Sequence, residues 1–166
     1  MPQFLYEFNP TNKIVADAVG EPGRRTFYLQ ARQGRTLATV QIEKFQAQVL
    51  AESLDELLEK VGGPEAASTS ELHLEEPLEP LFRAGQIGLG HDAKTDHIVI
   101  IIYEVAESED TDPDTLTAVR FWISREQARA LALHAVMVCA GGRPICVFCG
   151  NPIDADAHFC PKRNGH

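Results

Sequence analysis

The sequence predicts an α+β fold in which two helices pack on an antiparallel sheet, with a small zinc knuckle at the C-terminus. Three observations lead to this prediction. Strand-like stretches precede each of two amphipathic helices. The start of one helix resembles the start of the other, and cysteines and histidines gather in residues 143–166. We expect a duplicated core (1–142) with approximate halves 1–63 and 81–142, joined by an acidic loop (64–80).

The first half begins with four predicted strands. Residues 4–8 and 13–19 are short apolar runs. Residues 26–32 and 36–42 alternate apolar and polar side chains, as a half-buried strand does. Residues 21–24 (EPGR) carry Pro and Gly where a type II turn favours them. These signals predict a meander of strands.

Each set of strands is followed by a predicted helix. The first has apolar residues at helical spacing, namely Leu50, Leu54, Leu57, Leu58 and Val61. The second begins at Ser124, with Gln127 placed to complete a capping box. IEKFQAQVLA (42–51) and ISREQARALA (123–132) match at five of ten positions with an offset of 81. We interpret this match as an internal strand-strand-helix duplication; convergence of amphipathic helices on Ala, Leu and Gln is the alternative.

The second half repeats the strand signals after a loop. Residues 64–80 are rich in Pro, Ser and Glu without a period, which predicts an exposed, mobile loop. Residues 82–90, 97–105 and 117–123 are the next predicted strands. The middle one contains IVIIIY, which is apolar on both faces and therefore predicts cover on both faces. Residues 104–115 carry six acids and predict a solvated loop.

The C-terminal tail carries a pattern of zinc ligands. Cys146 and Cys149 form a C-x-x-C pair followed by a glycine, and Cys160 lies further on. Thiolates and imidazoles are the ligands that Zn²⁺ prefers, and structural sites use four of them. His158 is two residues before Cys160, so in an extended segment both side chains point the same way. We expect a structural zinc ion bound by Cys146, Cys149, His158 and Cys160, with His166 as the alternative to His158.

Other interpretations of these cysteines are free thiols, a redox pair, or a catalytic zinc ion with only three protein ligands. Gly150 and Pro152 oppose the helix that follows a thioredoxin-like pair. Cys139 lies on the apolar stripe of the second helix and is expected to pack in the core. His134 lies off that stripe and is expected in solvent.

Charge and composition restrict the function. The net charge of −9 disfavours general nucleic-acid binding, because an acidic surface repels phosphates. The sequence has no apolar run long enough for a transmembrane helix, and its first residues do not resemble a signal peptide. We therefore expect a cytoplasmic protein, in which a reducing environment favours metal binding over a disulfide.

Four arginines around one predicted hairpin form the clearest cationic cluster, namely Arg24, Arg25, Arg32 and Arg35. They are candidates to bind a small anion or a phosphorylated metabolite. No phosphate-binding, dinucleotide-binding, nucleophile-elbow or metalloprotease motif is present. The sequence thus favours a protein without a catalytic site, although it leaves the question open.

Several motifs together resemble one bacterial family. They are FNP (8–10), VGEPGRRTFYLQAR (19–32), IEKFQ (42–46), FRAG (82–85), and GRPICVFCGNPID with HFCPKRNG in the tail. The chain is similar over nearly its whole length to the family catalogued as domain of unknown function 3090. The resemblance implies His158 as the fourth ligand, through an H-x-C pattern. It also implies a compact cytoplasmic protein with a partner role in a phosphorylation-linked pathway, because members are encoded near kinase-like and histidine-phosphatase-like proteins.

Three functions are consistent with these observations. The first is a protein-binding or adaptor module, for which the IVIIIY strand and the acidic loops would suit self-association or a basic partner. The second is a small-anion binder or enzyme that uses the arginines. The third is nucleic-acid binding through the knuckle, with phosphates contacted by Arg143, Lys162 and Arg163. We expect the first.

Overall fold

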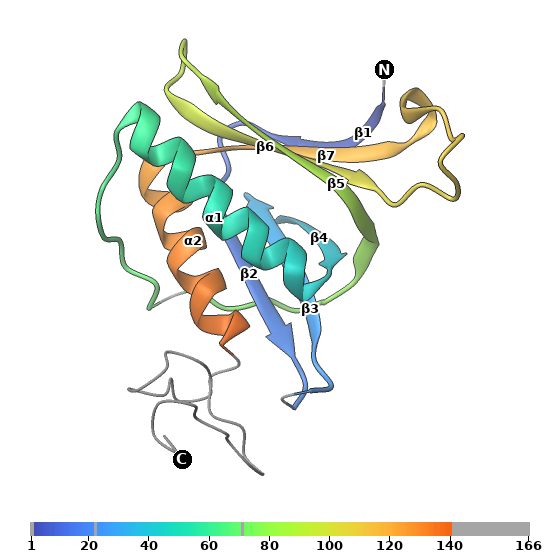
Figure 1. Ribbon diagram of the computed structural model, residues 1–166, viewed down its shortest axis with the longest axis horizontal. Coiled ribbons are helices and arrows are strands. Elements are labelled where there is room, and N and C mark those ends of the chain that lie inside the picture. Colours follow the sequence, from blue (N-terminus) through green and yellow to red (C-terminus); the bar gives the residue numbers. More distant parts are fainter. Residues whose placement is uncertain (1, 22, 71, 141–166) are drawn as a thin grey trace, which may run out of the picture.

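The computed structural model describes residues 2–21, 23–70 and 72–140, which form one mixed sheet with two helices on one face (Figure 1). The first strands are β1 (Gln3–Phe8), β2 (Lys13–Val19), β3 (Thr26–Gln33) and β4 (Thr36–Ile42), followed by helix α1 (Lys44–Val61). The next elements are β5 (Pro80–Asp92), β6 (His97–Glu104), a short 3-10 turn (Pro113–Thr115), β7 (Thr117–Ile123) and helix α2 (Arg125–Cys139).

The α+β class is confirmed, but the sheet is mixed rather than antiparallel. Its strand order is β1-β7-β6-β5-β4-β3-β2. The pairs β1/β7 and β4/β5 are parallel, and the other pairs are antiparallel. The β4/β5 pair is parallel because α1 carries the chain back across the sheet before β5 begins beside β4. The prediction of an antiparallel sheet was wrong because periodicity gives strands without their partners.

Two halves of the sheet repeat the same arrangement. Strands β2, β3 and β4 form an antiparallel meander followed by α1, and β5, β6 and β7 form another followed by α2. Each unit therefore has a third strand beyond the predicted strand-strand-helix pattern. Ala38 on β4 pairs with Ala31, and Val119 on β7 pairs with Ile102. Ala38 and Val119 differ by 81 positions, the offset of the repeated helix motif.

Equivalent glutamines attach each helix to the sheet. The side-chain amide of Gln46 donates to the Gly85 carbonyl at 2.8 Å, and that of Gln127 donates to the Thr11 carbonyl at 2.9 Å. Each glutamine also closes a capping box. The box predicted for the second helix is confirmed, and the first helix has an equivalent one. The shared motif therefore fixes how each helix starts.

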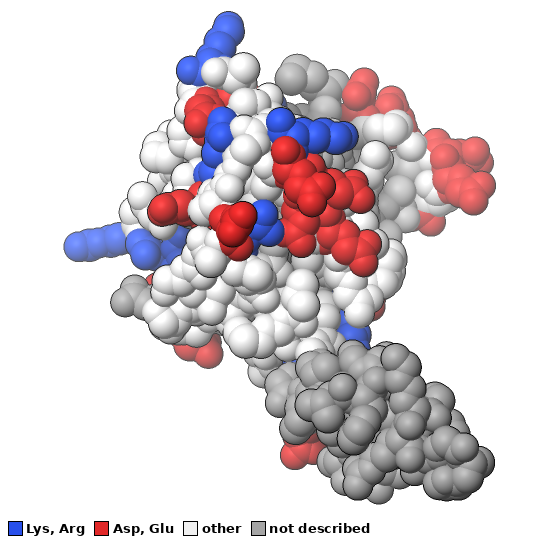
Figure 2. Space-filling view, turned by 60° about the vertical axis from the view of Figure 1, so that its left-hand side comes forward, with Lys and Arg blue, Asp and Glu red and all other residues white. Residues whose placement is uncertain are grey.

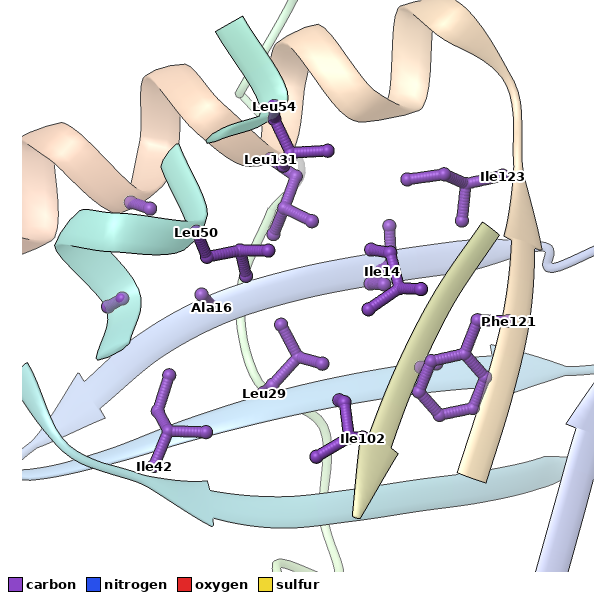
Figure 3. Packing of buried hydrophobic residues seen from close by; sticks show 14 of the residues in the cluster. Ile14, Ala16, Leu29, Ile42, Leu50, Leu54, Ile102, Phe121, Ile123 and Leu131 are labelled. Carbon is purple, nitrogen blue, oxygen red and sulfur yellow. The ribbon is translucent and has the colours of Figure 1, made fainter. Parts of the chain in front are cut away.

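The core lies between the helices and the inner face of the sheet (Figure 3). Leu54 of α1, Leu131 of α2 and Ile123 of β7 are fully buried, and Phe121 of β7 is only 1 % exposed. The two helices run antiparallel. Arg125 at the start of α2 donates to the Val61 carbonyl at the end of α1, and the Cys139 Sγ at the end of α2 lies 3.8 Å from the Lys44 carbonyl at the start of α1. Burial of these apolar side chains is the main stabilising contribution to the fold.

The segment between α1 and β5 is a loop whose described residues are mostly exposed, as predicted, and side chains of β2 and β3 attach it to the sheet. Lys13 donates to the His73 carbonyl at 2.8 Å. The guanidinium of Arg32 forms an ion pair with Glu75 at 3.1 Å. Leu74 is only half-exposed. Composition indicated a loop correctly but could not show that its backbone is held by strands β2 and β3.

Candidate functional site

The predicted zinc ligands, Cys146, Cys149, His158 and Cys160 with the alternative His166, lie outside the described residues. Within the described part of the chain, no group of three or more His, Cys, Asp or Glu side chains could hold a metal ion. Cys139 is buried in the core, as predicted, and this burial raises the pKa of its thiol. Zinc binding by the tail stays a prediction.

The four arginines proposed as an anion site are divided into two pairs at opposite ends of β3. Arg24 and Arg25 precede the strand, whereas Arg32 lies near its end and Arg35 follows it. Arg25 and Arg32 are seven positions apart, which corresponds to about 23 Å along an extended strand. A small anion cannot contact both pairs, so the structure does not bring these residues together as one site.

Of these four arginines, Arg25 lines a polar cavity at the N-terminal end of α1. The cavity has a volume of about 320 Å³ and is also lined by Lys44 and Glu43. Arg25 donates to the Val138 carbonyl at 2.8 Å and lies 4.9 Å from the centre of the Phe27 ring. Its guanidinium is therefore held in place, and a helix N-terminus adds a favourable dipole for an anion. The Glu43 carboxylate at the same cavity offsets one of the two positive charges.

A second, apolar cavity lies between α1 and β5, and we call it the α1–β5 groove. Its volume is about 220 Å³, and its lining includes Phe45, Val49, Leu50, Ser53, Ile87 and Leu89. Phe45 is 63 % exposed and Val49 is 52 % exposed, which is unusual for large apolar side chains on a helix. The signal in the sequence is an apolar i, i+4 pair, Phe45 and Val49, outside the stripe that begins at Leu50.

At the equivalent place the other half has a polar cavity of about 670 Å³, whose lining includes Glu126, Gln127 and Ala130 of α2. At the offset of 81, Val49 corresponds to Ala130 and Ser53 corresponds to His134. His134 is only 7 % exposed, and its Nε2 lies 3.1 Å from a carboxylate oxygen of Asp17 on β2. The expectation that His134 lies in solvent was wrong, because α2 packs beside β2 and Asp17 supplies a buried partner. The groove beside Phe45 and Val49 is therefore apolar, whereas its counterpart beside Ala130 is polar.

Carboxylates continue from the groove along α1. Glu52, Glu56 and Glu59 are exposed and follow Phe45 and Val49 at spacings of three or four residues, which places all five on one side of the helix. Figure 2 shows Asp and Glu side chains gathered on the face that it presents. The surface beside the groove is thus apolar at one end of α1 and acidic at the other.

Asp17→Asn should lower the free energy of unfolding by about 1.5–3 kcal/mol at pH 7, as expected for a hydrogen bond to a charged group. Burial raises the pKa of Asp17, but hydrogen bonds from His134 and the Ala18 N–H, with the nearby charge of Arg25, outweigh burial and lower the pKa below its usual value. A lowered pKa stabilises the folded state above the unfolded value of about 4, and that contribution disappears as the pH falls through the folded value.

The predicted pH dependence can be checked by urea denaturation of the wild type and the Asp17→Asn variant. The measurements are made at pH 7 and at pH 2–3, ~1–2 units below the usual carboxyl pKa. The difference between the two proteins should shrink at the lower pH. A difference that stays the same at both values would contradict a contribution from the Asp17 carboxylate.

Neither helix in the described residues combines the length and the apolar character needed to cross a membrane. No curated protein and no solved structure matches the chain. One family model, described as protein of unknown function (DUF3090), matches residues 6–160. That match covers most of the sequence, including both halves of the sheet and most of the cysteine-containing tail, and the chain belongs to the DUF3090 family.

Proposed function

We propose that the protein is a protein-binding or adaptor module and that the α1–β5 groove binds its partner. The supporting observation is the contrast between the halves: the cavity beside Ala130 is lined by charged side chains such as Lys13 and Glu126, whereas Phe45 and Val49 border an apolar groove. Exposed apolar side chains around a concave surface are typical of protein interfaces. The groove of about 220 Å³ suits one or two apolar side chains, since small-molecule pockets are usually about 300–1,000 Å³.

The charge next to the groove indicates the chemistry of the partner. An apolar side chain of the partner would pack against Phe45 and Val49, and basic side chains would lie next to Glu52 and Glu56. An amphipathic helix with apolar residues at one end and Lys or Arg towards the other has this pattern. The carboxylates would then favour correct orientation and faster association more than they would add affinity.

Val49→Asp should weaken partner binding by about tenfold or more, because it puts a charge into an apolar contact. Affinity purification of the tagged full chain from its own cells, with quantitative mass spectrometry, identifies proteins that the variant loses. Binding is then measured directly with each purified candidate. Circular dichroism should show the same folded protein, because Val49 is 52 % exposed.

Val19→Asp is the matched control, because Val19 is 50 % exposed at the end of β2 and does not line the groove. It should recover the same partners as the wild type. Equal loss of partners in both variants, or no protein recovered above background with the wild type, would refute the groove as a binding site.

We also propose that Cys146, Cys149, His158 and Cys160 bind a structural zinc ion, with His166 as the alternative to His158. Four N and S ligands leave no position for water, so the ion would fold the tail and would not catalyse a reaction. A cytoplasmic location, which would keep the thiols reduced, is part of the same proposal. The internal duplication, nucleic-acid binding and the phosphorylation-linked pathway stay predictions.

Anion binding is the alternative function, and the cavity beside Arg25 and Lys44 is the observation that favours it. Arg32 and Arg35 would not take part, since they lie at the far end of β3. Thermal stabilisation by pyrophosphate that is abolished in Arg25→Ala would favour this function over protein binding.

A further inference from the structure

Exposed apolar side chains concentrate on the outer surface of the two helices. Nine large apolar side chains are exposed in the described residues, and five of them belong to α1 or α2. They are Phe45, Val49, Leu133, Val136 and Met137. Val136 is 57 % exposed and Met137 is 51 % exposed. The apolar strand β6 contributes none of the nine, so the apolar surface in contact with solvent lies mainly on the helices.

The exposed apolar residues of α2 correspond, at the offset of 81, to acidic residues of α1. The three pairs are Leu133/Glu52, Val136/Asp55 and Met137/Glu56. The reverse holds at the helix starts, where the exposed Phe45 of α1 corresponds to the exposed Glu126 of α2. Each helix therefore has an apolar part and an acidic part, but the two parts follow in opposite order along the chain.

Because the two helices run antiparallel, this opposite order brings like parts together. Arg129 forms an ion pair with Asp55, and the Cys139 Sγ lies next to the Lys44 carbonyl. These contacts set the register of the two helices, which lie side by side in Figure 1. Since both helices rise equally per residue, residues 133–137 of α2 lie beside residues 46–51 of α1.

The helix pair thus has one apolar end and one acidic end. The apolar helix end consists of Phe45, Val49, Leu133, Val136 and Met137, and the acidic helix end consists of the exposed carboxylates Glu52, Glu56, Glu59 and Glu126. An exposed apolar patch of this kind, bordered by charged groups, is typical of a protein interface.

We propose that the basic amphipathic helix of the protein partner packs along α1 and α2 as a third helix, so that Val136 and Met137 bind it together with the α1–β5 groove. This inference rests on the proposed protein-binding function and extends the binding surface from one helix to two. Residues 45–59 of α1 span about 21 Å, which matches a partner helix of about 15 residues. Its apolar side chains pack on the apolar helix end and its Lys or Arg side chains lie at the acidic helix end.

Charge favours such a partner over a second copy of this chain. Arg129 pairs with Asp55 and Arg125 pairs with Asp96, so these two cations are already engaged. Together with the exposed Lys60, the four carboxylates leave the acidic helix end negative. A second copy carries the same acidic end and a net charge of −9, so it offers no basic surface to match. A helix rich in Lys or Arg is complementary to this end.

Photo-cross-linking with the full chain in its own cells tests whether one partner segment contacts both helices. Val49→p-benzoylphenylalanine and Val136→p-benzoylphenylalanine place the reactive group on α1 and on α2. Mass spectrometry should show that both variants cross-link to the same Lys- or Arg-containing peptide of the same protein. Leu5→p-benzoylphenylalanine is the matched control, because Leu5 is an exposed apolar residue on the edge strand β1, and it should not capture that peptide.

The outcomes separate this inference from the proposed function. Capture from position 49 but not from position 136 would overturn the inference and leave the groove in place. Cross-links from position 136 that reach only a second copy, or only residues of the same chain, would overturn it as well. If neither position captured a protein above the Leu5 control, the proposed function would be refuted together with it.

Direct binding of the captured protein, after purification, provides the second measurement. Val136→Asp should weaken binding by about tenfold, because it puts a charge into an apolar contact, and it should leave the circular dichroism spectrum unchanged. Glu56→Lys should slow association, with the largest effect at low salt. Leu5→Asp should bind as the wild type does. Wild-type affinity in Val136→Asp would overturn the inference even if Val49→Asp bound weakly.

Discussion

Phe121→Ala should lower the free energy of unfolding by about 3–5 kcal/mol, the usual cost of truncating a buried aromatic residue. Phe121 is 1 % exposed, and its ring centre lies 5.4 Å from that of Phe8. Phe8 lies on β1 and Phe121 on β7, so the contact joins the first strand of the chain to the last. The variant would therefore leave a cavity and weaken the attachment of β1. Urea denaturation followed by circular dichroism measures the change.

Phe45→Ala is the matched control for this prediction. The same side chain is removed, but Phe45 is 63 % exposed on α1, so stability should change by no more than about 0.5 kcal/mol. Comparable losses in the two variants would mean that Phe45 is buried in the folded protein. The groove could not then be open, and the proposed function would lose its basis.

Cys149→Ser should remove bound zinc from the protein while the α+β core stays folded. A serine hydroxyl is a poor substitute for a thiolate, and structural zinc sites contribute about 10–16 kcal/mol to folding of the segment that binds them. Metal analysis of purified, tag-free protein should therefore fall from about one zinc ion per chain, the occupancy expected of a single four-ligand site, to near zero. The circular dichroism of the core should persist, because the described core buries its apolar residues without the tail.

Cys139→Ala is the control for metal binding. Cys139 is 6 % exposed in the core, and its Sγ lies 3.8 Å from the Lys44 carbonyl. This variant should keep its zinc and lose about 1 kcal/mol of stability, the cost of a small cavity. Wild-type protein free of metal would refute the zinc site. Complete unfolding of Cys149→Ser would instead show that the core depends on the tail.

The site could be predicted only in part from the sequence. Phe45 and Val49 form an apolar pair on the outer side of a helix, so they could have been recognised as unusual. The groove itself also needs Ile87 and Leu89, which come from a strand about 40 positions later. The four arginines do not form one site for a related reason. Arg25 and Arg32 are close in sequence, but they lie at opposite ends of an extended strand.

The sequence by itself determined the local elements of this protein, because periodicity, turns and capping are properties of short stretches. The strands, the two helices and the Ser124 capping box follow from residues less than about one helical turn or strand length apart. Tertiary structure decided which strands pair, since β4 meets β5 only after α1 has crossed the sheet. It also decided that His134 is buried against Asp17 while Phe45 stays exposed, because those outcomes depend on how closely each helix packs against a distant strand.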